Sequence, residues 1–320
     1  MKPPVFEYVR AESLEHAVET IGALGEDAKF IAGGQSLVPL MAVRLAWPSH
    51  LVDISGITEL SGILVAHGGA LTIGASTVQR TVERSAEVAA ACPLLPEAIS
   101  HIGHFPIRNR GTIGGSLAHG DPASELPLCA VALDAELVTR HHENGRRVIP
   151  ASDFFVGPLM TDLEPGELVT EVRVPAWPAG AGWGFQEFSR RSGDFAVAAV
   201  AALLRLGDDG TIADGRIAVA GAGPTPLRLT EAEAVLRGRR PDREVFRAAG
   251  AQVARSLDPQ SDSNGSADYR RKLAAVLAAE MRSCQAAVLA QEIGQRPACL
   301  DGGRPRLAVD HQVDLDAVRH

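Results

Sequence analysis

Two pairs of adjacent glycines, each at a turn that leads toward a helix, are the residues best suited to hold a ligand. The first pair is Gly33-Gly34 in the segment IAGGQSLVPLM, residues 31–41, where a short apolar run precedes the turn. Glycine permits positive φ angles and lets a ligand approach the backbone closely. The N–H groups at the start of a helix attract anions. The segment therefore predicts a diphosphate site, but a strand-to-helix turn with nothing bound would give the same pattern.

The second pair is Gly114-Gly115 in the segment TIGGS, residues 112–116. The flanking hydroxyls of Thr112 and Ser116 can hydrogen-bond phosphate or ribityl oxygens. Two such turns predict a cofactor that carries a pyrophosphate between two larger groups. Neither turn has the Rossmann spacing, and Gly221-Ala222-Gly223 lacks its third glycine, so we interpret that cluster as a strand end and turn.

Cysteine spacing and charge limit the other kinds of site and partner. Cys92, Cys129, Cys284 and Cys299 are scattered, which indicates neither a zinc site nor an iron–sulfur cluster. The net charge of -8 argues against nucleic acid or anionic lipid as the main partner. No run approaches the roughly 20 apolar residues of a membrane helix, and no signal peptide is evident. We expect no membrane span and a reduced, cytoplasmic setting.

The elements that position the first turn form a small α/β unit. A length of 320 residues predicts two or three domains, and an aromatic content of 4% requires a core of Ala, Val, Leu and Ile. Apolar spacing predicts a helix over 13–24, with Ser13 as its N-cap and Gly25 as its stop. We expect a strand at 29–32, a helix at 36–46 and a strand at 51–54.

The second turn lies in a longer region that ends at a Pro/Gly-rich linker near 175–182. Before the linker we expect a hairpin over 63–75, a helix over 85–103, a long loop that holds the turn, a helix or turn at 126–134, strands at 136–140 and 146–149, a connecting loop over 156–166, and a strand at 167–174. After it we expect three antiparallel strands at 183–190, 195–206 and 211–221, then helices near 230–238, 242–257 and 266–291.

Several segments, in the right order, resemble the FAD-binding (medium) subunit family of molybdenum hydroxylases, which includes the medium subunits of xanthine dehydrogenase and carbon monoxide dehydrogenase. They are residues 31–55, 107–127, 154–175, 190–201 and 265–277. The resemblance implies an α+β protein with the vanillyl-alcohol-oxidase-like (PCMH-type) FAD-binding fold of two α/β subdomains. It also implies a C-terminal domain of a three-stranded antiparallel sheet with a helical bundle. The expected units are 1–55, 56–178 and 179–290, with a tail over 291–320.

The resemblance also implies which residues contact the cofactor, FAD. The first turn would cradle the pyrophosphate with Ala32, Gly33, Gly34, Gln35, Ser36 and Leu37. The second turn would approach it with Thr112, Gly114, Gly115 and Ser116. Glu125 falls where relatives often have an Asp near the ribityl or phosphate groups. Ile102 falls where xanthine dehydrogenases carry an aromatic residue that packs on the isoalloxazine. Asp194 falls in a turn on the flavin side. Covalent relatives in the wider fold often attach FAD through a His or Cys. Since Gln35 occupies the polar position of the first turn here, we expect FAD to be bound noncovalently.

The function implied by the resemblance is electron transfer, with no catalytic residue. Electrons would pass from a molybdopterin-binding large subunit through the [2Fe–2S] clusters of a small subunit to FAD. NAD⁺, a quinone, oxygen or another acceptor would then take them. The assembly would be a heterotrimer or a dimer of heterotrimers. Two alternatives stay open: a freestanding FAD-dependent oxidoreductase that acts directly on a small molecule, and a flavin-free interaction subunit.

Three groups of polar residues are also candidates for a site. His101, His104 and His119 suggest a possible metal site, and the spacing of His101 and His104 suits two ligands on a helix. No third ligand is fixed, so surface or flavin-proximal histidines are the favoured interpretation. His141 and His142 fall at a predicted hairpin and are expected to be solvated. Arg108 and Arg110 flank the second glycine turn, where they could pair with phosphate or form surface salt bridges.

Overall fold

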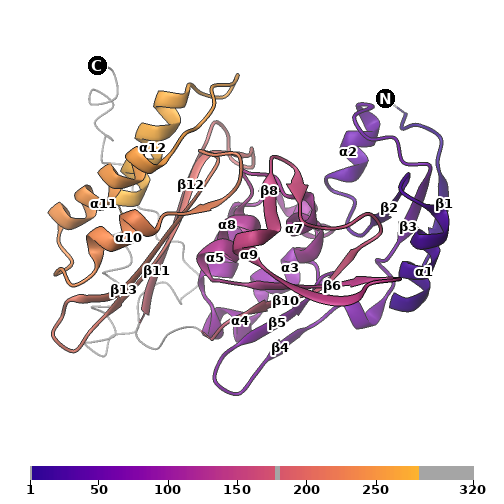
Figure 1. The fold of residues 1–320 in the computed structure, drawn as a ribbon, viewed down its shortest axis with the longest axis horizontal. Helices are drawn as coiled ribbons and strands as arrows, with labels where there is room; N and C mark the ends of the chain where they lie inside the picture. Colours follow the sequence, from indigo (N-terminus) through magenta and orange to yellow (C-terminus); the bar gives the residue numbers. More distant parts are fainter. Residues whose placement is uncertain (1, 177–180, 281–320) are drawn as a thin grey trace.

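The computed structural model describes residues 2–176 and 181–280, which form three units along the long axis of the molecule (Figure 1). The N-terminal unit is a three-stranded parallel sheet in the order β1-β3-β2. Its elements are β1 (Glu7–Arg10), α1 (Leu14–Leu24), β2 (Ala28–Ile31), α2 (Leu37–Ala42) and β3 (His50–Asp53). The parallel order places β3 between the other two strands, so the β2–α2 turn lies at one edge of the sheet.

Helix α1 begins and ends as its sequence predicts. Ser13 accepts a hydrogen bond from the His16 N–H, and Gly25 closes the helix at a φ of 81°. The predicted helix over 36–46 is wrong in length, because α2 ends at Ala42. Strand β1 is an addition that the sequence pattern did not predict.

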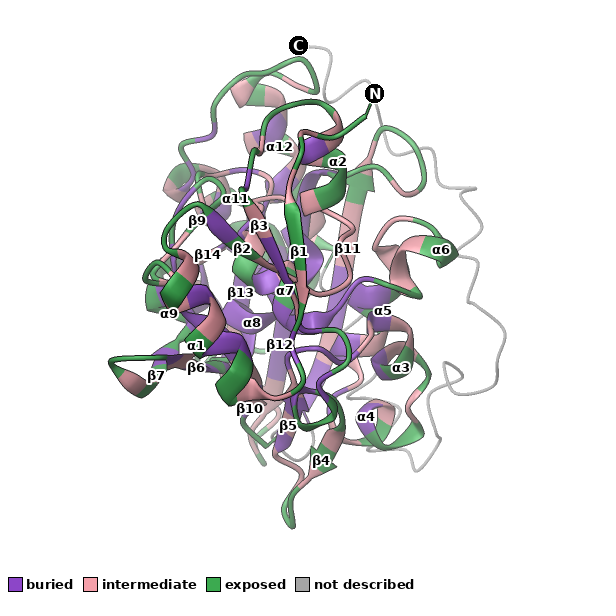
Figure 2. Ribbon diagram, turned by 90° about the vertical axis from the view of Figure 1, so that its right-hand side faces the viewer, coloured by how far each residue is buried: buried purple, intermediate pink, exposed green. Residues whose placement is uncertain are grey.

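The middle unit is a five-stranded antiparallel sheet in the order β4-β5-β10-β6-β7, covered by helices. Its elements are η1 (Thr58–Leu60), β4 (Ile63–Val65), β5 (Leu71–Gly74), α3 (Gln79–Arg84), α4 (Ala86–Ala91), α5 (Leu94–His101), α6 (Phe105–Arg108), α7 (Ile113–His119), α8 (Glu125–Ala132), β6 (Glu136–His141), β7 (Gly145–Pro150), α9 (Ala151–Phe154), β8 (Phe155–Gly157), β9 (Met160–Thr161) and β10 (Leu168–Val174). Every residue of α8 is buried, so this helix forms the centre of the molecule (Figure 2).

Two predictions about this unit are corrected. The single helix over 85–103 is two helices, α4 and α5, which meet at Cys92 and Pro93. The long loop that holds the second glycine turn contains α6 and α7 and leads into α8. Helices as short as α6 and α7 display no clear hydrophobic period, and their stability comes from caps and tertiary packing.

The C-terminal unit is a four-stranded sheet in the order β11-β12-β13-β14 with helices against one face. Its elements are β11 (Ala181–Ser189), β12 (Ala196–Leu206), β13 (Ile212–Ala220), β14 (Leu227–Arg228), α10 (Thr230–Leu236), α11 (Arg243–Ser256) and α12 (Ala267–Ala279). The predicted three-stranded sheet is therefore wrong by one strand. Strand β14 spans only Leu227–Arg228, too short for an alternating pattern, and is defined by its pairing with Ala218 and Val219.

Both faces of this sheet are buried, which explains why β12 is almost entirely apolar. Ala199, Ala201 and Leu203 belong to the core shared with the middle unit. Val200 and Leu204 belong to a second core that the sheet forms with α10–α12. The C-terminal sheet is thus held against the middle unit by a continuous core.

The ends of the predicted units fall partly outside the described residues. These are the linker at 177–180, the end of the predicted helix over 266–291, and the tail over 291–320. Within the described ranges, no helix is long and apolar enough to cross a membrane.

Candidate cofactor-binding site

A cavity of about 730 Å³ is lined by all three units. Cavities that bind small ligands are roughly 300–1,000 Å³. Every residue predicted to contact the cofactor lines it: Ala32, Gly33, Gly34, Gln35, Ser36, Leu37, Ile102, Thr112, Gly114, Gly115, Ser116, Glu125 and Asp194. Segments that are far apart in the sequence therefore meet around one space.

The first glycine turn is held tightly against the segment before the second turn. A Cβ atom on Gly33 would lie 2.1 Å from the carbonyl oxygen of Arg110, so only glycine fits there. Gly34 has a φ of 69°, in the left-handed region that favours glycine. The first pair thus serves two purposes, since Gly33 permits a close approach of two backbones and Gly34 permits the turn.

The turn also leaves polar groups unused. The Gln35 amide donates to the Gly33 carbonyl oxygen at 3.1 Å and so folds back on the turn. The backbone N–H groups of residues 33–37 donate to no acceptor among the described residues. Unpaired N–H groups at the start of α2, on the cavity wall, suit the oxygens of a diphosphate.

The second glycine turn is the N-terminus of α7, and its two glycines differ. The Thr112 hydroxyl caps the helix by accepting from the Gly115 N–H at 3.1 Å. A Cβ on Gly114 would lie 2.4 Å from the Cβ of Ala75, so Gly114 is required by packing next to β5. A Cβ on Gly115 would meet only the Thr112 hydroxyl, at 2.7 Å. Of the two, Gly115 is the one whose added side chain would meet no backbone.

Gln79, at the start of α3, is a cavity residue that sequence reasoning missed. It is 4% exposed, and its Oε1 atom has no hydrogen-bond partner among the described residues. A buried, unpaired acceptor is costly unless a bound group donates to it. No sequence signal marks Gln79, because it stands in an ordinary polar stretch whose burial depends on tertiary packing.

Glu125 is a buried carboxyl group on the cavity wall. Its side chain lies in the first turn of α8, and the residue is 5% exposed. Burial raises the pKa of Glu125 to about 8, and the charge of Glu187 on β11 contributes. At neutral pH the protonated carboxyl group can both donate and accept a hydrogen bond.

We predict that Glu125→Gln changes how stability depends on pH. Between pH 4.5 and about 8 the folded chain keeps the Glu125 proton while the unfolded chain releases it, so wild-type stability falls as pH rises. The loss is at most about 1.4 kcal/mol per pH unit. In thermal melts, the melting temperature of the variant should therefore rise relative to that of wild type from pH 5 to 8. If melting temperature depended on pH in the same way in both proteins, Glu125 would be ionised in the folded chain. The control for the lost charge is Glu136→Gln, because Glu136 is exposed.

His101, His104 and Arg108, near the second turn, make contacts within the protein. Arg108 donates to Glu83 at 2.9 Å and to the carbonyl oxygen of Ile102 at 2.9 Å, which favours the salt-bridge interpretation for this residue. The ring of His101 lies 5.0 Å from that of Phe185, and a Cβ on Gly193 would contact the ring of His104. Within the part of the chain that the structure describes, no group of residues is arranged to hold a metal ion.

Comparison with known proteins decides the family. Residues 4–177 match the family described as the FAD binding domain in molybdopterin dehydrogenase, and residues 183–283 match the CO dehydrogenase flavoprotein C-terminal domain. The chain belongs to the family of molybdopterin dehydrogenase flavoproteins that the first match describes. It is an FAD-binding flavoprotein, and its family is one of oxidoreductases.

Similar proteins span nearly the whole described chain. The chain is 44% identical to the 6-hydroxypseudooxynicotine dehydrogenase complex subunit alpha of Paenarthrobacter nicotinovorans, over 85% of this chain and 92% of the relative. It is 42% identical to the carbon monoxide dehydrogenase medium chain of Hydrogenophaga pseudoflava, over 86% and 94%. A solved structure of carbon monoxide dehydrogenase from that organism superposes with a TM-score of 0.86 over 89% of this chain and 99% of that one.

Proposed function

We propose that this chain is the FAD-carrying electron-transfer subunit of a molybdenum hydroxylase complex. The observation that carries the proposal is the meeting of two glycine turns across one cavity, in a chain whose residues 4–177 match an FAD-binding family. Within residues 2–176 and 181–280, the N–H groups of residues 33–37 and the Gln79 Oε1 atom have no partner, and a bound nucleotide would satisfy them. The residues present therefore fit FAD.

Each part of the cavity would hold a different part of the cofactor. Residues 32–37 would bind the pyrophosphate through backbone N–H groups, and residues 112–116 would approach it from the other side. Protonated Glu125 would donate a hydrogen bond in the ribityl or phosphate region, while Ile102 and Asp194 would lie toward the isoalloxazine. When bound, FAD would supply the redox chemistry, and the chain's residues would bind and orient it. No side chain is assigned a catalytic role, and a noncovalent site is supported by Gln35 at the turn.

The finer fold and assembly are part of the same proposal. The N-terminal and middle units, 1–55 and 56–178, would form the vanillyl-alcohol-oxidase-like (PCMH-type) fold, followed by the C-terminal domain, 179–290. The partners would be a molybdopterin-binding large subunit and a [2Fe–2S] small subunit, because relatives are named as medium chains or complex subunits. Cys92 and Cys129 are free thiols in the described part of the chain, which supports the cytoplasmic setting.

The test is affinity purification of the full chain from its native host, followed by metal and cofactor analysis. We expect a yellow chain that co-purifies with a molybdenum-containing large subunit and an iron–sulfur small subunit. A yellow chain that purifies alone and oxidises a small molecule would support the freestanding oxidoreductase instead. A colourless chain that still binds its partners would support the flavin-free interaction subunit.

A further inference from the structure

One wall of the cavity is made by a single turn of chain, residues 162–167, just before β10. Residues 163–169 line the cavity beside α1, at the N-terminal unit. A Cβ on Gly166 would lie 3.6 Å from Cγ2 of Ile21, so the turn also packs on α1. Ile102 follows α5, which lies on the side of the middle unit that faces the C-terminal unit (Figure 1). The wall is therefore at the opposite end of the cavity from the residues assigned to the isoalloxazine.

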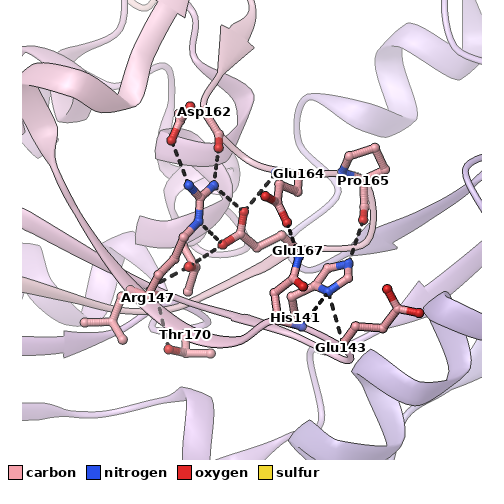
Figure 3. A network of polar contacts seen from close by, with 11 residues as sticks. His141, Glu143, Arg147, Asp162, Glu164, Pro165, Glu167 and Thr170 are labelled. Carbon is pink, nitrogen blue, oxygen red and sulfur yellow. Dashed lines mark hydrogen bonds and ion pairs between the residues drawn. The ribbon is translucent and has the colours of Figure 1, made fainter.

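Arg147, on β7, holds both ends of this turn (Figure 3). Its Nε atom donates to Glu167 Oε1 at 2.6 Å, and its Nη2 atom donates to Glu167 Oε2 at 2.6 Å. Its Nη1 atom donates to the Asp162 carboxylate at 2.9 Å, and Nη2 also donates to the Asp162 carbonyl oxygen. One guanidinium group thus fixes the first and last residues of the turn, a geometry that only the planar fork of arginine provides.

The Glu167 carboxylate is enclosed by donors. The side chain of Glu167 is only 2% exposed, and it accepts from the Thr139 hydroxyl at 2.5 Å and from the Glu164 N–H at 2.8 Å. Burial alone would raise the pKa of Glu167, but the hydrogen bonds from Arg147 and Thr139 outweigh it and hold the pKa below its usual value. An exposed salt bridge contributes little to stability, whereas a buried carboxylate that loses its partner is strongly destabilising.

The tip of the β6–β7 hairpin supports the middle of the same turn. His141 Nδ1 accepts from the N–H groups of Glu143 and Asn144, each at 3.2 Å. The other ring nitrogen is therefore protonated and donates to the Pro165 carbonyl oxygen at 3.1 Å. The expectation that His141 is solvated is wrong, because it is 7% exposed under the turn.

None of the hairpin residues in this network lines the cavity, although the turn that they hold does. Arg147, Thr139 and His141 act from behind the wall, so their effect on a ligand is through position. With the pyrophosphate between the glycine turns and the isoalloxazine toward Ile102, the adenosine half of FAD is left to the end beside α1.

We infer that the Arg147–Glu167 brace positions the 162–167 wall against the adenosine half of FAD, and thereby sets the preference for FAD over FMN, which lacks that half. The inference rests on the proposed function. Arg147 and Glu167 are positioning residues: Arg147 lies behind the wall, and the Glu167 side chain, which is 2% exposed, holds the turn from within it.

The test compares flavin affinities of the full chain after removal of its flavin, using quenching of flavin fluorescence. Arg147→Met should weaken FAD binding by roughly 10- to 100-fold, the range found when outer supports of a bound group are lost at metal sites. FMN affinity should stay within about twofold. Thr139→Val, which removes one hydrogen bond to Glu167, should give a smaller loss for FAD in the same direction.

The matched control is the neighbouring residue on β7. Arg146 pairs with Glu171 at 3.3 Å on the surface, so Arg146→Met removes an arginine and an ion pair without touching the wall. It should leave both affinities unchanged. Equal losses for FAD and FMN in Arg147→Met, or an unchanged FAD affinity in that variant, would overturn the inference while the proposed function stands. A wild-type chain that binds neither flavin would defeat the proposed function, and the inference with it.

Discussion

Replacing Gly33 with valine is expected to abolish flavin retention. The new Cβ would lie 2.1 Å from the carbonyl oxygen of Arg110 and 2.8 Å from its carbonyl carbon, and backbone atoms cannot move aside as a side chain can. The two glycine turns would be forced apart, so N–H groups 33–37 would no longer face residues 112–116 across the cavity. The measurement is the ratio of flavin to protein absorbance in the purified variant.

The control for this prediction is Gly210→Ala, in the turn between β12 and β13. Gly210 has a φ of 73°, and no atom of the described part of the chain lies within 4 Å of its added Cβ, so the substitution introduces backbone strain without a clash there. This control should keep its flavin. Full flavin occupancy in Gly33→Val would show that the approach of the two turns is not needed for binding.

Arg270→Met is expected to lower the free energy of unfolding by about 3 kcal/mol, since it leaves buried acceptors unpaired. Arg270, on α12, is 6% exposed and donates to the carbonyl oxygens of Val197 at 2.8 Å and Gly221 at 2.5 Å. It also donates to both oxygens of Asp262 at 2.7 Å. The substitution would remove this donor from both carbonyl groups. Denaturant unfolding of the full chain measures the change.

The next residue of α12 gives a matched comparison. Arg271 is half-buried, pairs with the exposed Asp268 at 2.7 Å and makes one long hydrogen bond to a carbonyl oxygen, that of Leu257, at 3.3 Å. Arg271→Met should therefore change stability by no more than about 0.5 kcal/mol. Similar losses for the two variants would show that the carbonyl contacts of Arg270 contribute little. The Gly221 N–H donates to the Pro122 carbonyl oxygen at 2.8 Å, and Pro122 lies just before Ser124 and Glu125 on the cavity wall. A change at Gly221 could therefore reach the cavity, so flavin content should also be recorded for Arg270→Met.

Local sequence patterns predicted the ends of elements well where one residue supplies the signal. Ser13 and Gly25 bound α1 because a side-chain oxygen and a residue without Cβ are what helix ends require. Patterns failed where packing decides the element. Strand β14 exists through its pairing with β13. Residues 113–119 form α7, in which Gly114 packs closely on Ala75 next to β5.

The sequence by itself determined the kind of ligand: two glycine turns for a pyrophosphate, with the family segments specifying FAD. It also identified the residues that now line one cavity. Only the tertiary structure decided why Gly33 must be glycine, that Gln79 carries an acceptor with no partner among the described residues, and that Glu125 is buried enough to hold its proton. It alone brought Arg147 to Glu167 behind the wall. The physical reason is that glycine turns act through local backbone conformation, whereas burial and pairing depend on residues far away in the chain.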